Sequence, residues 1–143
     1  MDPIFEAYKQ ILRESIDLTN HKPKYSREDR QAKLLKLAYK KIQDYIDNGS
    51  RGDLDLSNTQ ITSLPDNLEV GGHLYLYKTP ITSLPDNLNV GGGLNIRNTP
   101  ITSLPDNLKV GGVIYLRNTP ISKKYATEEL ERMLPGVRGN IKY

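Results

Sequence analysis

The stretch "ITSLPDNL" at residues 61–68 recurs unchanged at residues 81–88 and again at residues 101–108. Each copy begins twenty residues after the one before, so the register contains neither an insertion nor a deletion. A fixed period of about 20 residues is typical of a solenoid, in which each coil buries its apolar side chains against the next coil. The invariant letters therefore predict the scaffold, and function is to be sought in the positions that vary.

The coils are expected to run over residues 54–73, 74–93 and 94–113, with a truncated fourth copy from Ile114. Each opens on an apolar-x-apolar triplet, which predicts a short strand with its first and third side chains buried. Pro65, Pro85 and Pro105 exclude a helix interior from the return segment, which we expect to be extended or to hold a single tight turn. The Gly-Gly pairs at 71–72, 91–92 and 111–112 are predicted to allow the bend into the next strand.

Residues 1–49 hold no copy of the repeat and predict a helical hairpin. The first helix is expected to have Asp2 as its N-cap and Pro3 at its first position. Residues 17–26 are polar and favour a loop, after which Ser26 and Asp29 predict a capped second helix that ends at residues 48–49. The apolar positions expected to pack are Ile4, Tyr8, Ile11 and Leu12 in the first helix, and Leu34, Leu35, Ala38, Ile42, Tyr45 and Ile46 in the second.

At the other end, "VRGNIKY" (residues 137–143) aligns with the start of a coil and predicts a fifth strand, with Ile141 at the position of Ile114. The preceding insert predicts a short helix that has Thr127 as N-cap and lays Leu130, Met133 and Leu134 over the open end. The chain is thus expected to be an α+β repeat solenoid with a curved parallel sheet. It divides into an N-terminal helical cap (1–49), the repeats (50–122) and a C-terminal cap of helix and strand (123–143).

Composition narrows the class of protein. Of the 143 residues, 36% are apolar, which suits a thin core, and the absence of cysteine excludes disulfides and thiolate sites. No apolar run reaches the length of a membrane span, and the start lacks the apolar region of a signal peptide. We therefore expect a soluble protein that stays in the compartment where it is made.

The pattern L-x-L-x-x-T-x-I-x-x-L-P-x-x-L resembles a short form of the leucine-rich repeat. "NTPITSLPDNLKVGG" (residues 98–112) is similar to the LPDNLxVGG repeats of bacteria and tailed phages, and more distantly to the twenty-residue repeats of bacterial effectors delivered into host cells. The resemblance covers residues 50–122 but not residues 1–49, and no effector-type catalytic domain follows. It implies a curved parallel sheet whose concave face binds other proteins. Thr59, Thr79, Thr99 and Thr119 stand where that family usually has an asparagine ladder.

Comparison of the coils with one another shows which positions are free to serve a partner. Strand alternation points the varying side chains of each triplet toward the face opposite the core, which is expected to be concave. Tyrosine and arginine dominate interface hot spots, so this face predicts a protein-binding surface for an acidic or mixed partner. The alternative is a solvated face on which Tyr77 stacks on Arg97. The candidate partner-binding residues are Asp55, Tyr75, Tyr77, Lys78, Asn95, Arg97, Tyr115, Arg117 and Lys142. The entrance edge of the concave face is expected to be lined by Asp53, His73, Gly93 and Val113.

Weaker signals are interpreted structurally. The varying residues Glu69, Asn89 and Lys109 are expected only to solvate the outer side. His21 and His73 are isolated, so no metal site is predicted. Further patterns are the carboxylate row Asp66, Asp86 and Asp106, which suits turn capping better than calcium, and the tripeptide Arg51-Gly52-Asp53, which lies at a bend and is attributed to chance.

No catalytic constellation is found in the sequence, because Asp53 and Asp55 are the only acids clustered on the expected concave face and no histidine completes a site. We therefore predict a non-catalytic adaptor or inhibitor without cofactor or metal. The alternative is a structural virion or assembly component docked through residues 1–49. A weak nucleic-acid binder comes third, since a net charge of +3 does not suggest a strong phosphate track.

Overall fold

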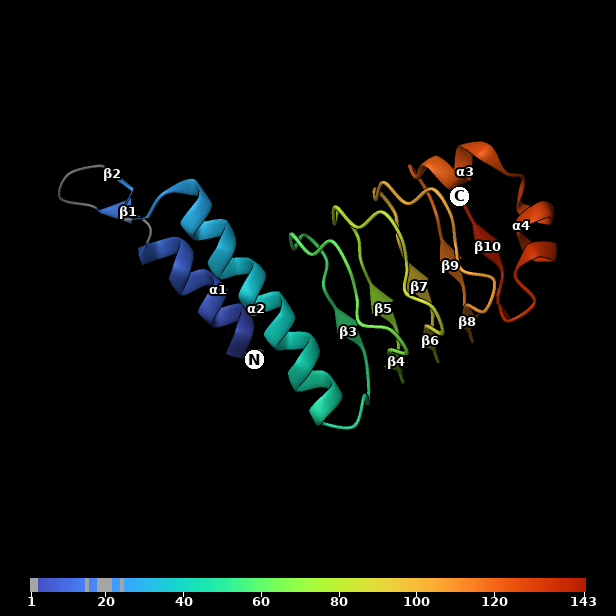
Figure 1. Cartoon of the computed structure of the whole chain (residues 1–143), viewed down its shortest axis with the longest axis horizontal. Helices are drawn as coiled ribbons and strands as arrows, with labels where there is room; N and C mark the ends of the chain where they lie inside the picture. Colours follow the sequence, from blue (N-terminus) through green and yellow to red (C-terminus); the bar gives the residue numbers. More distant parts are fainter. Residues whose placement is uncertain (1–2, 15, 18–21, 24) are drawn as a thin grey trace.

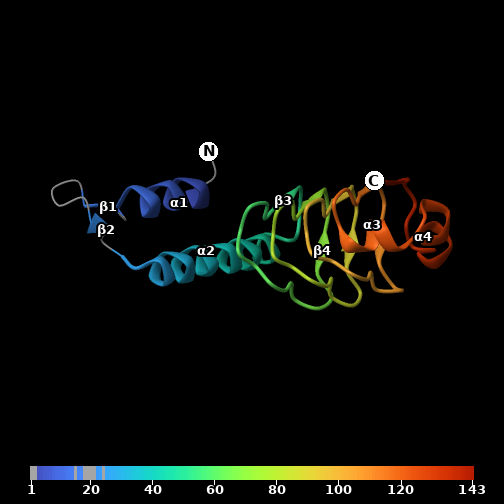
Figure 2. The same ribbon diagram turned by 90° about the horizontal axis from the view of Figure 1, so that it is seen from above.

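The computed structural model describes residues 3–14, 16–17, 22–23 and 25–143. It is a β-solenoid of about three turns built from two parallel sheets, with helices at both ends (Figure 1). Seen from above, the coils stack along the long axis of the molecule between these helices (Figure 2). No helix among these residues is long and apolar enough to cross a membrane.

The larger sheet has five parallel strands in the order β3-β5-β7-β9-β10. Equivalent residues of successive coils pair directly, as Leu54 does with Leu74 and Leu74 with Leu94. Ile141 pairs with Ile114, which confirms the predicted fifth strand. The strands are β3 (Leu54–Asp55), β5 (Leu74–Tyr75), β7 (Leu94–Asn95), β9 (Ile114–Tyr115) and β10 (Ile141–Lys142).

A second parallel sheet lies on the return side of the coil and was not predicted from the sequence. Its strands are β4 (Glu69–Val70), β6 (Asn89–Val90) and β8 (Lys109–Val110). A bridge between Val110 and Val137 continues the sheet into the last coil. Each strand has only two residues, which is too short to show an alternation of apolar and polar residues, so no pattern in the sequence predicts this sheet.

The core runs unbroken through the stack because every coil contributes the same apolar positions. In the first coil these are Leu54, Leu56, Ile61, Leu64, Leu68 and Val70, and all of them are buried. The invariant "ITSLPDNL" thus supplies one isoleucine and two leucines to the interior, as predicted. Burial of each such side chain contributes about 1.5–3 kcal/mol.

The chain bends at the Gly-Gly pairs, as predicted, but the reason for glycine there is different. In the part of the chain described, only Gly49 and Gly52 among the glycines have positive φ, so the pairs are not needed for backbone freedom. A Cβ atom on Gly71 would lie 2.8 Å from the carbonyl oxygen of Ser50, and one on Gly91 would strike the carbonyl of Gly71. The pairs therefore let neighbouring coils approach closely. The residues in the left-handed region lie at other turns of the coil: Asn58, Lys78, Asn98 and Asn118 follow the strands of the larger sheet, and Asn67 and Asn87 lie in the outer turns.

The N-terminal region holds α1 (Pro3–Glu14), which packs against α2 (Arg27–Asp47). Ser26 and Asp29 form the predicted capping box, and α2 ends before Asn48, which is its C-cap. The loop expected at residues 17–26 includes a short antiparallel pair instead, β1 (Ile16–Asp17) with β2 (Lys22–Pro23). The N-cap expected at Asp2, and the side-chain packing expected of Ile4, Tyr8 and Leu12, lie outside the described residues.

The second helix contacts the first coil. Ala38 and Ile42 are buried in the same core cluster as the coils, with Leu35 and Tyr45 packed against it, whereas Ile46 is exposed. The Tyr45 hydroxyl lies 2.9 Å from the carbonyl oxygen of Ser50 and 2.7 Å from that of Gly52, and it accepts the N–H of Gly71 at 3.1 Å. This hydroxyl therefore joins the helix, the connecting turn and the first coil.

A hydrogen bond between the hydroxyls of Tyr39 and Ser63 (3.5 Å) lies at the same junction and lowers the pKa of Tyr39. It adds a second polar contact between α2 and the first coil.

The C-terminal region corrects two expectations. A helix that was not predicted, α3 (Pro120–Lys124), begins at a capping box of Thr119 and Ser122. The expected helix is α4 (Thr127–Met133), but its N-cap is Ala126 rather than Thr127. Leu130 and Leu134 are buried as predicted, whereas Met133 is 45% exposed. The helix ends at Met133, and Leu134, which is its C-cap, leaves the helical conformation and enters the core.

Candidate protein-binding site

The candidate residues gather on the outward side of the five-stranded sheet. Because Leu74 and Leu76 point into the core, the side chains between and beyond them face outward. Lys142 lies beside Tyr115 through the pairing of β10 with β9. We call this the tyrosine–arginine surface, made of Asp55, Tyr75, Tyr77, Lys78, Asn95, Arg97, Tyr115, Arg117 and Lys142.

Arg97 lies at the centre of this surface. Its guanidinium carbon is 5.8 Å from the ring centroid of Tyr77 and 5.5 Å from that of Tyr115. Both distances fall within the range of about 6 Å over which a cation attracts an aromatic face. The stacking of Tyr77 on Arg97 that the sequence suggested is therefore present, and Tyr115 adds a second ring.

Asn95 holds Arg97 in this position. Its Oδ1 accepts hydrogen bonds from the Nε of Arg97 at 3.1 Å and from the backbone N–H of Arg97 at 3.2 Å. Asn95 itself is only 9% exposed, so it serves the arginine rather than offering its own amide to a partner. Asp55 has the same local geometry, because its Oδ1 accepts the N–H of Ser57 at 2.9 Å.

Lys78 occupies a turn position that asparagine fills in the other coils. Its φ is 55°, close to the 56° of Asn98 and the 59° of Asn118. Asparagine tolerates this left-handed region better than lysine does. Asn118 also donates to the Oδ1 of Asn98 at 2.9 Å, a side-chain contact between coils. Lys78 gives up these advantages and places a cation 5.2 Å from the Tyr77 ring.

The entrance edge is occupied by structural hydrogen bonds. Asp53 Oδ1 accepts the N–H of His73, and His73 Nδ1 accepts the N–H of Gly93, both at 2.7 Å. The Nδ1 of His73 therefore carries no proton here, and the imidazole ring lies 5.9 Å from the Tyr75 ring. These two side chains link successive coils.

The two arginines of the surface differ in their surroundings. Arg97 is half-buried and turns toward the tyrosines, whereas Arg117 is exposed. Arg117 is thus the more accessible cation and Arg97 the more rigidly held one.

The other sequence signals have structural explanations. Each repeat threonine donates to the carbonyl of its own coil, as Thr99 does to Ile96 at 2.7 Å, so these threonines do not form a ladder. The outer turns are instead joined by asparagines, with Asn87 donating to Asn67 at 2.9 Å and Asn107 donating to Asn87 at 2.6 Å. Within the described ranges no group of three or more potential metal ligands occurs, and His21 lies outside them.

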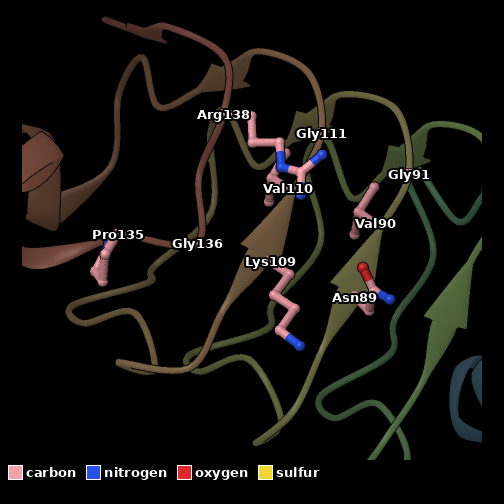
Figure 3. A pocket seen from close by; sticks show the side chains of 9 residues that line it. All are labelled: Asn89, Val90, Gly91, Lys109, Val110, Gly111, Pro135, Gly136 and Arg138. Carbon is pink, nitrogen blue, oxygen red and sulfur yellow. The ribbon is translucent and has the colours of Figure 1, made fainter.

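One feature was missed from the sequence, a hollow of about 450 Å³ on the three-stranded sheet (Figure 3). Lys109, which was expected only to solvate that side, lines it together with Arg138, which was not singled out. Two signals could have indicated it. The outward column changes from Glu69 through Asn89 to Lys109, and "VRGN" places Arg138 where the coils have glycine.

No protein-family model, curated protein or solved structure matches this chain.

Proposed function

We propose that this chain is a non-catalytic interaction module that binds a protein partner through the tyrosine–arginine surface. The observation that carries the proposal is the position of Arg97 between Tyr77 and Tyr115, fixed by the Asn95 amide. Tyrosine and arginine supply most of the binding energy in many interfaces. Side chains already held in place lose less conformational entropy when a partner arrives.

The charge of the surface suggests the chemistry of the partner. Lys78, Arg97, Arg117 and Lys142 are cationic, and the single carboxylate, that of Asp55, accepts the backbone N–H of Ser57. Opposite charges across an interface favour encounter and select among partners. We therefore favour an acidic or mixed partner surface that also offers apolar contacts for the tyrosine rings.

The arrangement of the coils supports a leucine-rich repeat with a cap at each end. We infer that residues 50–122 are short leucine-rich repeats of the LPDNLxVGG type, whose five-stranded sheet would form the concave side. Terminal coils of a solenoid need covered ends. The buried Ala38 and Ile42 of α2, and the buried Leu130 and Leu134 of the last repeat, support caps at both ends. The protein would act as an adaptor or inhibitor in the cytoplasm of a bacterium or an infected cell.

The proposal is tested by affinity capture from a lysate of the native host. The wild type is compared with the double variant Arg97→Glu/Arg117→Glu, and both are first shown by circular dichroism melts to be folded. A matched control, Lys123→Glu/Arg132→Glu, makes the same change in charge at exposed positions away from the tyrosine–arginine surface. We expect one protein to be retained by the wild type and the control but lost from the Arg97/Arg117 variant.

Equal retention by all three chains would overturn the proposal and direct attention to residues 1–49 as the docking element of an assembly. Salt-sensitive retention of nucleic acid, lowered by both double variants alike, would overturn it in favour of a general cationic surface.

A further inference from the structure

The hollow on the three-stranded sheet lies on the opposite side of the coil from the tyrosine–arginine surface. It extends over β6, β8 and the segment that follows α4, which joins the sheet through Val137 (Figure 3). Its volume of about 450 Å³ falls in the range of about 300–1,000 Å³ that is usual for small-ligand sites.

Glycines form part of the floor of the hollow. Gly91 and Gly111 line it next to Val90 and Val110, whose side chains are buried. Both must be glycine, since a Cβ atom would strike the carbonyl of the coil before. This part of the floor therefore consists of the backbone of closely stacked coils.

The walls of the hollow are cationic. Arg138 reaches across Val110 toward Gly111, and Lys109 extends on the other side of Val110 (Figure 3). The backbone of each is anchored, because the N–H of Arg138 donates to Val110 at 2.8 Å and that of Lys109 to Leu88 at 3.0 Å. The Asn89 amide on the neighbouring strand adds a neutral donor, and no acidic residue lines the hollow.

The two cations have no anion of their own. Within the described residues, neither Lys109 nor Arg138 forms a salt bridge or a side-chain hydrogen bond. Arginine binds phosphate through paired hydrogen bonds, and the exposed Lys109 adds a second positive charge at the same hollow.

We propose that this hollow binds the phosphate group of a small phosphorylated molecule, with Arg138 and Lys109 as its charged contacts and Asn89 as a neutral donor. This site is separate from the tyrosine–arginine surface, so the two proposals stand or fall independently.

The test is a titration of ¹⁵N-labelled full-length protein with glycerol 3-phosphate and with inorganic phosphate, followed by NMR at pH 7.5. Sodium acetate at equal ionic strength serves as the monoanion comparison. We expect both phosphates to shift the amide signals of Gly91, Gly111 and Gly136 saturably, and acetate not to do so. Repeating the titration at pH 5.5 should weaken binding, because the second pKa of a phosphate monoester is about 6.

Three variants separate a site from general charge attraction. Arg138→Gln and Lys109→Gln should each weaken glycerol 3-phosphate binding about tenfold or more, the loss expected for a charged hydrogen bond. Lys123→Gln removes an exposed cation outside the hollow and should leave the dissociation constant unchanged. Shifts that do not saturate, acetate shifts as large as those from phosphate, or an equal loss in all three variants would overturn the proposal.

Discussion

The two outward faces of the solenoid are built from the same coil, yet their side chains are organised differently. On the five-stranded sheet, cations and tyrosines contact one another across neighbouring coils, as Arg97 does with Tyr77 and Tyr115. On the three-stranded sheet, Lys109 and Arg138 lie around a hollow floored in part by glycines, without a partner among the described residues. The comparison shows that the inward positions determine the fold, whereas an outward cation is held only where neighbouring side chains contact it, as Asn95, Tyr77 and Tyr115 contact Arg97.

Substitution of an inward position is expected to have the largest effect on the free energy of unfolding. Leu76 is fully buried, and Leu76→Ala should lower the free energy of unfolding by about 2–5 kcal/mol. The outward Asn89→Ala on the other sheet should change it by less than about 0.5 kcal/mol. Urea unfolding followed by circular dichroism measures both. Similar losses for the two variants would contradict the division into inward and outward roles.

The close approach of the coils can be tested at a glycine. Gly91→Ala should cost about 1–3 kcal/mol, because the new methyl group meets the carbonyl of Gly71. Gly52 has open space around it but a φ of +77°. Its replacement by asparagine should therefore be tolerated, whereas Gly91→Asn should not be. Thermal melts that rank Gly52→Asn as the more damaging variant would refute the contact explanation.

The junction between α2 and the first coil should depend on a single hydroxyl. Tyr45→Phe keeps the ring but removes the contacts to Ser50, Gly52 and Gly71, so we expect a loss of about 1–2 kcal/mol. Tyr39→Phe removes one exposed bond of 3.5 Å and provides the matched control, with a change close to zero. Denaturant unfolding of both proteins compares the two tyrosines directly.

The smallest expected effect has the opposite sign. Lys78→Asn restores the residue used at this turn in the other coils, so it should raise the free energy of unfolding by about 1 kcal/mol. If Lys78 serves the partner, the same variant should weaken capture by the tyrosine–arginine surface. A more stable variant with undiminished capture would remove Lys78 from the site.

Much of the fold could be predicted because the same apolar, proline and glycine positions recur every twenty residues. The strand positions, the fifth strand at Ile141 and the capping box at Ser26 follow from period and local chemistry. The three-stranded sheet and the exposure of Met133 could not be predicted, because each depends on how segments meet in space. The short helix α3 was missed although Thr119 and Ser122 form a local capping box. The contacts of Arg97 were partly visible from Tyr77, but the buried amide of Asn95 that holds it was not.

The exact register of the coils also makes the molecule extensible. Residues 74–93 begin and end at equivalent points of the stack, and their neighbours on both sides present nearly the same surfaces. Duplicating this segment should insert one complete layer, lengthening the protein by about 4.8 Å without disturbing either end. Such an insertion would add another Tyr75–Tyr77–Lys78 row to one face and another glycine step to the other. The number of coils therefore determines the length of both outward faces and so the size of the molecule that they can contact.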